Sequence, residues 1–259
     1  MQAMRGARCL LPDVGVQQPE SRFKICPGIH PRQRTRAMTP ERSARLDAVL
    51  ARRQPDLTVF AENLHKPRNF SAMVRTCDAV GINEMHVLPG EDAHRTHWKT
   101  SQGAEKWISI RIHASISEAC CQLKSSGFRL VAAHLGDTVI DYRDVDYTQA
   151  TALVFGTELF GVSDEVLTYV DQQIRIPMMG VSQSLNVSVA CAVVLYEAQR
   201  QRQAAGMYDS CRLDAATLKR QRFEWLQPVL AEYCQRHNFQ YPELDDTGDL
   251  AEPLPKIQD

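Results

Sequence analysis

Between residues 57 and 203 the chain alternates short apolar segments with longer amphipathic ones, and this alternation restricts the fold more than any other feature. We expect strands near residues 57–61, 83–88, 107–113, 128–133, 151–155 and 173–178, and helices near 69–80, 115–126, 164–170 and 186–203. Strands separated by helices of this length form βαβ units, with helices on both faces of the sheet. The predicted fold class is therefore α/β, with a mostly parallel sheet.

Helical extensions are predicted on both sides of this region. A helix is expected over residues 41–53, with Thr39 as its N-cap and Pro40 at its first position. A second helical segment is expected over residues 214–236, where Pro228 kinks or divides it. Two interpretations of that segment stay open: contact with RNA or a partner subunit, and packing onto the main domain.

The two ends of the chain have the composition of disordered segments. Residues 1–37 contain four prolines and seven Lys/Arg against two Asp/Glu, and residues from Tyr241 onward are acidic. We therefore divide the chain into a disordered extension (1–37), a main domain with its N-terminal helix (38–208), and a helical C-terminal extension with a disordered acidic end (209–259).

Charge and composition exclude several classes of protein. The net charge is −1, so attraction to nucleic acid must come from local clusters of arginine and not from the whole surface. The longest apolar run, residues 187–195, is far too short to span a bilayer, and the N-terminus has no apolar segment typical of a signal peptide. The eight cysteines lack metal-binding spacing. We expect a cytoplasmic protein with no membrane partner and no metal.

A polar junction between a strand and a helix is the strongest indication of a binding site. The segment from Ile176 to Ala190 leaves a strand, passes through Ser182, Gln183, Ser184 and Asn186, and continues as a long helix that either Ser184 or Asn186 can cap. Unpaired N–H groups at such a helix start suit anions and ribose hydroxyls. A nucleoside-triphosphate site at Gly156–Ser163 is disfavoured, because Val162 stands where a P-loop has lysine.

Three segments together resemble the motifs of one enzyme family. They are Asn69-Phe-Ser-Ala-Met-Val-Arg75, Phe155-Gly-Thr-Glu158 with Gly161, and the junction from Ile176 to Ala190. Their order and spacing are similar to those of the SpoU/TrmH (SPOUT) family of RNA ribose 2′-O-methyltransferases, from about Pro40 through Tyr208. The resemblance implies S-adenosylmethionine as cofactor, a C-terminal trefoil knot and a homodimer.

The resemblance also implies roles for individual residues. Arg75 would act at the ribose hydroxyl, either as a base or by electrostatic positioning, with Asn69, Ser184 and Asn186 orienting it and the substrate. Glu158 would support the substrate or the cofactor pocket. Ala133, Gly156, Ile176 and Leu185 would line the cofactor site. Arg42, Arg45, Arg53, Arg200 and Arg202 would contact RNA phosphates. Taken alone, Asn69 predicts only a helix N-cap, and Arg75 only an ion pair with Asp78 three residues on.

Within the family, the segments Arg52–Val59, His65–Pro67 and Tyr196–Arg202 also resemble one branch. The resemblance to this branch implies methylation of the D-loop guanosine of tRNA conventionally numbered eighteen. We therefore expect a tRNA (guanosine-2′-O)-methyltransferase that binds tRNA. Two alternatives stay open: a 2′-O-methyltransferase for another tRNA position or for rRNA, and a non-catalytic RNA-binding protein of the same fold.

Overall fold

A seven-stranded parallel sheet forms the centre of the molecule. The computed structural model describes residues 39–251, apart from residues 65, 91–105, 135, 137–138 and 158–160. In this part of the chain the strand order is β3-β2-β1-β6-β4-β7-β5, and every pairing is parallel. The strands are β1 (Leu57–Glu62), β2 (Glu84–Leu88), β3 (Ser109–Ile112), β4 (Arg129–Ala133), β5 (Ile140–Asp141), β6 (Thr151–Phe155) and β7 (Gln172–Arg175). The predicted fold class is confirmed.

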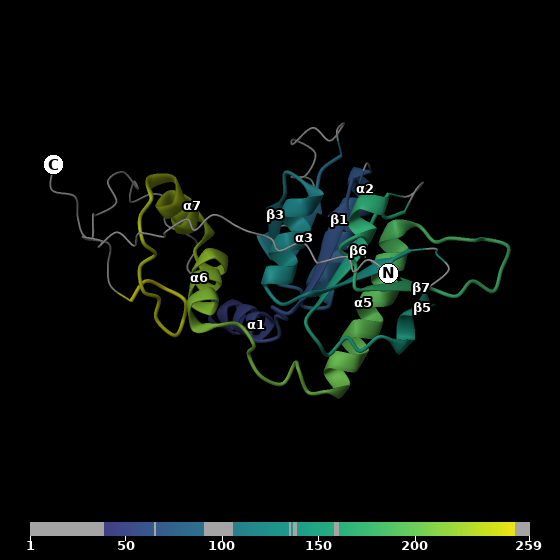
Figure 1. The fold of residues 1–259 in the computed structure, drawn as a ribbon. Coiled ribbons are helices and arrows are strands. Elements are labelled where there is room, and N and C mark those ends of the chain that lie inside the picture. The colour runs from purple at the N-terminus through teal and green to yellow at the C-terminus, as the bar shows by residue number, and fades with distance from the viewer. Residues whose placement is uncertain are drawn as a thin grey trace.

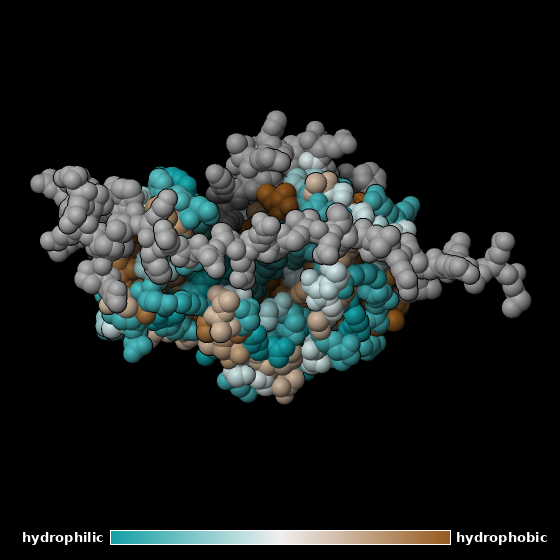
Figure 2. Space-filling view, turned by 60° about the vertical axis from the view of Figure 1, so that its left-hand side comes forward, coloured by the Kyte–Doolittle hydropathy of each residue, from teal (hydrophilic) through white to brown (hydrophobic). Residues whose placement is uncertain are grey.

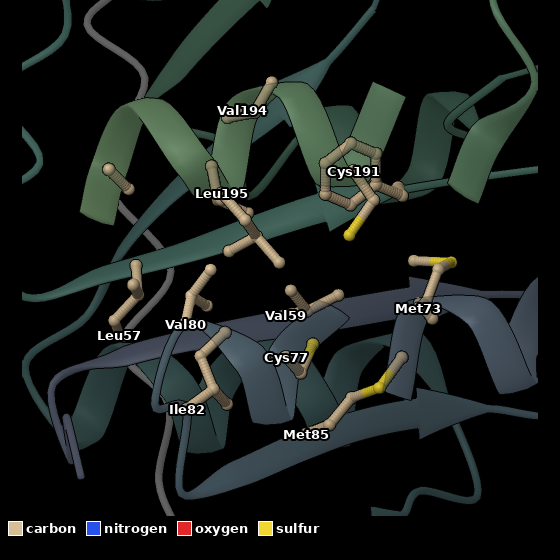
Figure 3. Close-up of a cluster of buried hydrophobic side chains, with 14 of the residues drawn as sticks. Leu57, Val59, Met73, Cys77, Val80, Ile82, Met85, Cys191, Val194 and Leu195 are labelled. Carbon is tan, nitrogen blue, oxygen red and sulfur yellow. The ribbon is translucent and has the colours of Figure 1, made fainter. Parts of the chain in front are cut away.

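Helices cover both faces of the sheet, because its central strands are apolar on both sides. Along β1, Val59 and Ala61 face one core and Phe60 between them faces the other, as strand alternation requires. The first core lies under α2 (Pro67–Ala79) and α5 (Val187–Ala204), and Figure 3 shows Val59 between side chains of these two helices. The second core lies under α3 (Ile116–Ser125) and the short α4 (Asp164–Leu167).

The structure corrects the expected strands at one edge of the sheet. The six expected strands are present, but β7 ends at Arg175 and not at residue 178, because its neighbour β5 offers only two residues, Ile140 and Asp141, to pair with. Strand β5 was not expected, since two residues give no detectable alternation. The trefoil knot stays a prediction of the resemblance.

The C-terminal extension packs onto the N-terminal helix, as one of the two interpretations anticipated. Helix α1 (Pro40–Leu50), capped by Thr39 as predicted, lies beside α6 (Ala215–Leu226), and Pro228 separates α6 from α7 (Pro228–His237). Leu50, Leu213 and Trp225 form a small core between them. Figure 1 shows α1, α6 and α7 as a helical lobe to one side of the sheet.

Part of the acidic end is ordered, contrary to the expectation of disorder from Tyr241 onward. Leu244 and Leu250 form a β-bridge, and the Tyr241 ring stacks on the buried Phe223 ring with 4.5 Å between ring centroids. The aromatic and leucine side chains of this segment therefore cover the end of α6. The predicted disorder of residues 1–37 concerns a segment outside the described residues, as does the end of the chain after Ala251.

Hydrophilic residues dominate the side of the molecule on which the helical lobe lies forward (Figure 2). Hydrophobic residues appear there only in small separate groups. No helix in the described ranges is long and apolar enough to cross a membrane.

Two buried histidines join strands β2 and β3. His86 Nδ1 and His113 Nε2 lie 2.8 Å apart in a hydrogen bond, and both side chains are almost fully buried. Burial lowers the pKa of His113, and the neighbouring His86 lowers it further. Glu118, Glu84 and Arg111 also surround the pair. The folded state therefore disfavours protonation of His113.

We expect the free energy of unfolding to fall as the pH drops below about 6.5, the ordinary histidine pKa. A lowered pKa in the folded state means that the unfolded chain binds the proton first, so this loss begins at the unfolded pKa and is absent above it. Urea denaturation at pH 7.5 and pH 5.5 measures it, with a limit of about 1.4 kcal/mol per pH unit for each proton. His113→Gln should show a shallower fall; an equal fall in both proteins contradicts this assignment.

Candidate active site and nucleic-acid interface

Three of the predicted cofactor-binding residues lie at the carboxyl ends of neighbouring strands. Ala133 ends β4, Gly156 follows β6, and Ile176 follows β7, and β4 pairs with both of the other strands. In parallel sheets the carboxyl ends of the strands are the usual place for ligands, because loops diverge there and leave backbone groups exposed. The fourth residue, Leu185, lies on the loop before α5 and is 36% exposed.

The two sides of the loop after β6 are joined by backbone hydrogen bonds near these strand ends. Thr157 and Gly161 exchange two backbone hydrogen bonds of 2.9 and 3.0 Å. A Cβ atom at position 156 would lie 1.9 Å from the Gly161 carbonyl oxygen, so only glycine fits there. The buried carboxylate of Glu62, at the end of β1, accepts the Ser163 N–H at 3.0 Å and fixes the far side of the turn.

His134, directly after β4, supplies a buried polar atom beside this turn. Its Nδ1 has no hydrogen-bond partner among the described residues and faces Gly161, whose added Cβ would lie 3.9 Å away. Buried polar atoms are normally paired, so an unpaired one beside a backbone cradle suits a small ligand with polar groups. His134 was not among the residues predicted from the sequence; the available signal was a polar residue immediately after a buried strand.

The first and third motifs meet through their asparagines. Asn186 caps α5 by accepting the Ser188 N–H, and its Nδ2 donates to Asn69 Oδ1 at 3.2 Å. Of the two candidate caps, the structure selects Asn186 and leaves Ser184 exposed on the loop. The prediction of Asn69 as an N-cap is wrong: α2 begins at Pro67, with Lys66 at the cap position. Glu158 lies outside the described residues.

Arg75 lies on the exposed side of α2 without an ion pair in the described part of the chain. The ion pair with Asp78, expected from helix spacing alone, does not form. Asp78 instead accepts a hydrogen bond from Arg53, with 2.6 Å between Nη2 and Oδ1. By holding Asp78, Arg53 leaves the Arg75 guanidinium available to a substrate.

Arg53 and Arg202 are buried, which contradicts their predicted role as phosphate contacts. Arg53 donates to the carbonyl oxygens of Ile82 and Trp107 besides Asp78, and its guanidinium lies over the Trp225 ring at 5.1 Å. Arg202 is likewise 0% exposed and has no surface for a phosphate. Its nitrogens donate to Asp56 Oδ1, Gln54 Oε1 and the backbone carbonyls of Asp56, Tyr147 and Gln149. Both arginines hold segments of the fold together.

The other three predicted phosphate contacts are exposed. Arg42 and Arg45 lie on α1, and neither guanidinium has an ion pair in the ranges that the structure describes. Arg200, on α5, forms two hydrogen bonds with Glu197 but keeps a side chain that is 67% exposed. These arginines stay candidates for RNA contact.

Comparison with known proteins decides the family. The SpoU rRNA Methylase family matches residues 56–196, and its C-terminal companion, described as SpoU, rRNA methylase, C-terminal, matches residues 200–253. The chain belongs to the SpoU methylase family. This SpoU methylase is 45% identical over 215 residues to the tRNA (guanosine(18)-2′-O)-methyltransferase of Escherichia coli K12, covering 82% of this chain and 94% of that protein. The corresponding Thermus thermophilus enzyme is 50% identical over 192 residues, covering 74% and 99%.

Solved structures are similar in fold as well as sequence. The TrmH/SpoU tRNA modifying enzyme of A. aeolicus superposes with a TM-score of 0.65 at 40% identity, covering 77% of this chain and 98% of that one. The SpoU methyltransferase AviRb of Streptomyces viridochromogenes, in complex with AdoMet, gives 0.52 at 28% identity, covering 58% and 62%.

Proposed function

We propose that this SpoU methylase transfers a methyl group from S-adenosylmethionine to the ribose 2′-hydroxyl of guanosine 18 in tRNA. The observation that carries the proposal is the hydrogen bond between Asn186 and Asn69, which joins two segments 117 residues apart. This bond joins the N-terminus of α5 to α2, the helix that also carries Arg75, which has no ion pair with any residue that the structure describes. The two relatives at 45% and 50% identity support the substrate.

The residues at the strand ends fit the cofactor. Ala133, Gly156 and Ile176 would hold it, with the unpaired His134 Nδ1 beside them. When bound, S-adenosylmethionine supplies an electrophilic methyl group on a sulfonium. In the transfer, the methyl group would pass to the ribose 2′-oxygen, S-adenosylhomocysteine would be released as the thioether, and the hydroxyl proton would pass to water.

Arg75 and the two asparagines have separate tasks in this transfer. A guanidinium at the 2′-oxygen stabilises the negative charge that develops there as the proton leaves. Asn69 and Asn186, fixed against one another, hold the approaching ribose in line with the methyl group, which removes much of the entropic barrier. No carboxylate of the described chain neutralises Arg75, so its full charge is available to the hydroxyl.

Transfer of tritiated methyl groups to unmodified tRNA tests the proposal. The purified enzyme should label tRNA, and should not label tRNA with 2′-deoxyguanosine at position 18. Label that persists in the deoxy tRNA assigns another position, and label only in rRNA assigns the alternative substrate. Cofactor and tRNA binding without any transfer would instead identify a non-catalytic RNA-binding protein.

We expect a homodimer, because apolar side chains are exposed beside the site. Met179 and Val181 on the loop before α5 are 94% and 97% exposed, and Val189 and Tyr196 are exposed seven residues apart on one face of α5. Groups of exposed apolar side chains are typical of interaction surfaces. Light scattering at micromolar concentration should give about twice the chain mass of 29.2 kDa.

A double substitution, Met179→Asp with Val181→Asp, should convert the dimer into a monomer by placing charges in the contact. The matched control is Ile112→Asp, which changes an exposed apolar residue on β3. This strand lies on the opposite side of the sheet from β7, the strand that precedes α5, so the variant should leave a dimer. A wild-type monomer that methylates tRNA contradicts the proposed dimer.

A further inference from the structure

A hollow of about 470 Å³ opens between the helical lobe and the sheet domain, apart from the strand ends described above. Helix α1 contributes Arg42, Arg45, Leu46 and Val49, and other elements contribute Asp78, Trp107 and Trp225. Trp107 is partly exposed, and its ring meets the buried Trp225 ring edge to face at 5.2 Å. The indole of Trp107 is thus held in place by a second aromatic ring and by the core around Leu50.

The hollow is lined by two positively charged side chains and one negatively charged side chain. Arg42 and Arg45 are both exposed, with no ion pair in the described part of the chain. Asp78 is fixed because its Oδ1 accepts the hydrogen bond from the buried Arg53, whereas its Oδ2 accepts none from the described residues. The hollow therefore offers two cationic groups, a flat aromatic surface and one oriented carboxylate oxygen.

We propose that this hollow binds a guanosine nucleotide of the substrate RNA, other than the one that is methylated. Guanine presents two adjacent N–H donors, at N1 and N2: the free Oδ2 of Asp78 can accept one, and Oδ1, which already accepts from Arg53, has a second lone pair for the other. Its ring would stack on Trp107, and its phosphate would lie against Arg42 and Arg45. The inference rests on the proposed function, because it takes the substrate to be RNA.

The bound nucleotide is distinct from the target because of the length of α2. Asp78 follows Asn69 by nine residues on this helix, which places them roughly 13 Å apart along its axis. Trp107 precedes β3, at the end of the sheet opposite to the strand ends that carry Ala133, Gly156 and Ile176, so the hollow and the proposed cofactor site lie at opposite ends of α2. The base must also be unstacked to enter, so the occupant is a nearby guanosine in a loop and not part of a duplex.

Inosine substitution in the RNA tests the assignment to Asp78. Inosine lacks the N2 amino group of guanosine and otherwise keeps its shape. Replacing each guanosine near the target in turn should weaken tRNA binding by about tenfold at one position, the usual effect of losing a hydrogen bond to a charged group. In Asp78→Asn the same replacement should weaken tRNA binding by no more than twofold.

Two further variants keep the proposal testable if Asp78→Asn disturbs Arg53. Trp107→Leu should weaken tRNA binding, and Arg42→Ala with Arg45→Ala should also flatten the salt dependence of binding, by roughly one unit of slope for each phosphate that is no longer neutralised. The control is Arg236→Ala, which removes an exposed, ion-paired arginine on α7 outside the hollow and should change neither.

The outcomes separate this inference from the proposed function. If no guanosine position shows a loss that Asp78→Asn removes, while the wild-type enzyme methylates tRNA normally, the hollow is not a guanosine site and the methyltransferase assignment stands. Failure of the wild-type enzyme to methylate any RNA overturns both.

Discussion

Arg75→Ala is expected to reduce methyl transfer to tRNA by on the order of a thousandfold or more, about 4 kcal/mol of transition-state stabilisation. Arg75 has no ion pair in the described chain and lies on the same helix as Asn69, so its removal deletes an available positive charge from the helix that carries the proposed ribose site. Single-turnover transfer of labelled methyl groups measures the loss. Because Arg75 is exposed, the thermal midpoint should stay within about 2 °C of wild type.

Binding measurements distinguish a catalytic role for Arg75 from a docking role. S-adenosylmethionine should bind Arg75→Ala with wild-type affinity in calorimetry, and tRNA should bind within a few-fold. Arg75→Lys keeps a charge but loses the planar donor geometry, so it should recover only a small part of the rate. Near-normal turnover in Arg75→Ala, or a loss confined to tRNA affinity, contradicts the catalytic assignment.

Much of the fold could be predicted because its segments are long and strongly patterned. Residues 152–155 are apolar, and with Thr151 they form the central β6, buried on both faces, with the predicted bounds. The long α5 was expected from its junction and begins at Val187. Where the pattern was short, prediction failed: β5 has two residues, and its pairing with β7 is determined by contacts between distant segments.

The candidate site could likewise be predicted only where it depends on local sequence. The position of Asn186 as a helix cap follows from local sequence, whereas its contact with Asn69 depends on how the sheet brings α5 to α2. Arg53 and Arg200 look alike in sequence, as arginines in clusters of positive charge. Arg53 is buried because Trp225 packs over it and Asp78 accepts its hydrogen bond, and both of these residues are remote from Arg53 in sequence. Arg200 has only its neighbour Glu197 as a partner and stays exposed.

Arg202→Met is expected to lower the free energy of unfolding by about 3 kcal/mol or more. Arg202 lies at 0% exposure and joins α5 to Asp56 before β1 and to the carbonyls of Tyr147 and Gln149 before β6. Methionine fills similar space but leaves Asp56 Oδ1 and the Tyr147 carbonyl without a donor, whereas the Gln149 carbonyl keeps the Thr151 hydroxyl, and Arg212 neutralises only the other oxygen of Asp56. Urea denaturation should show the loss, and thermal unfolding a drop of roughly 6–12 °C.

The matched control is Arg200→Met, two residues earlier on the same helix. Its side chain is 67% exposed and pairs with Glu197 on the surface, so the free energy of unfolding should change by about 1 kcal/mol or less. The effects on RNA should be the reverse: Arg200→Met is the variant expected to weaken tRNA binding and flatten its salt dependence, because an exposed arginine can reach a phosphate. Folded Arg202→Met, measured well below its thermal midpoint, should bind tRNA as the wild type does. An unchanged stability together with weakened, less salt-dependent tRNA binding in Arg202→Met would return this arginine to the RNA interface, and would require α5 to release its contacts with Asp56 when RNA binds.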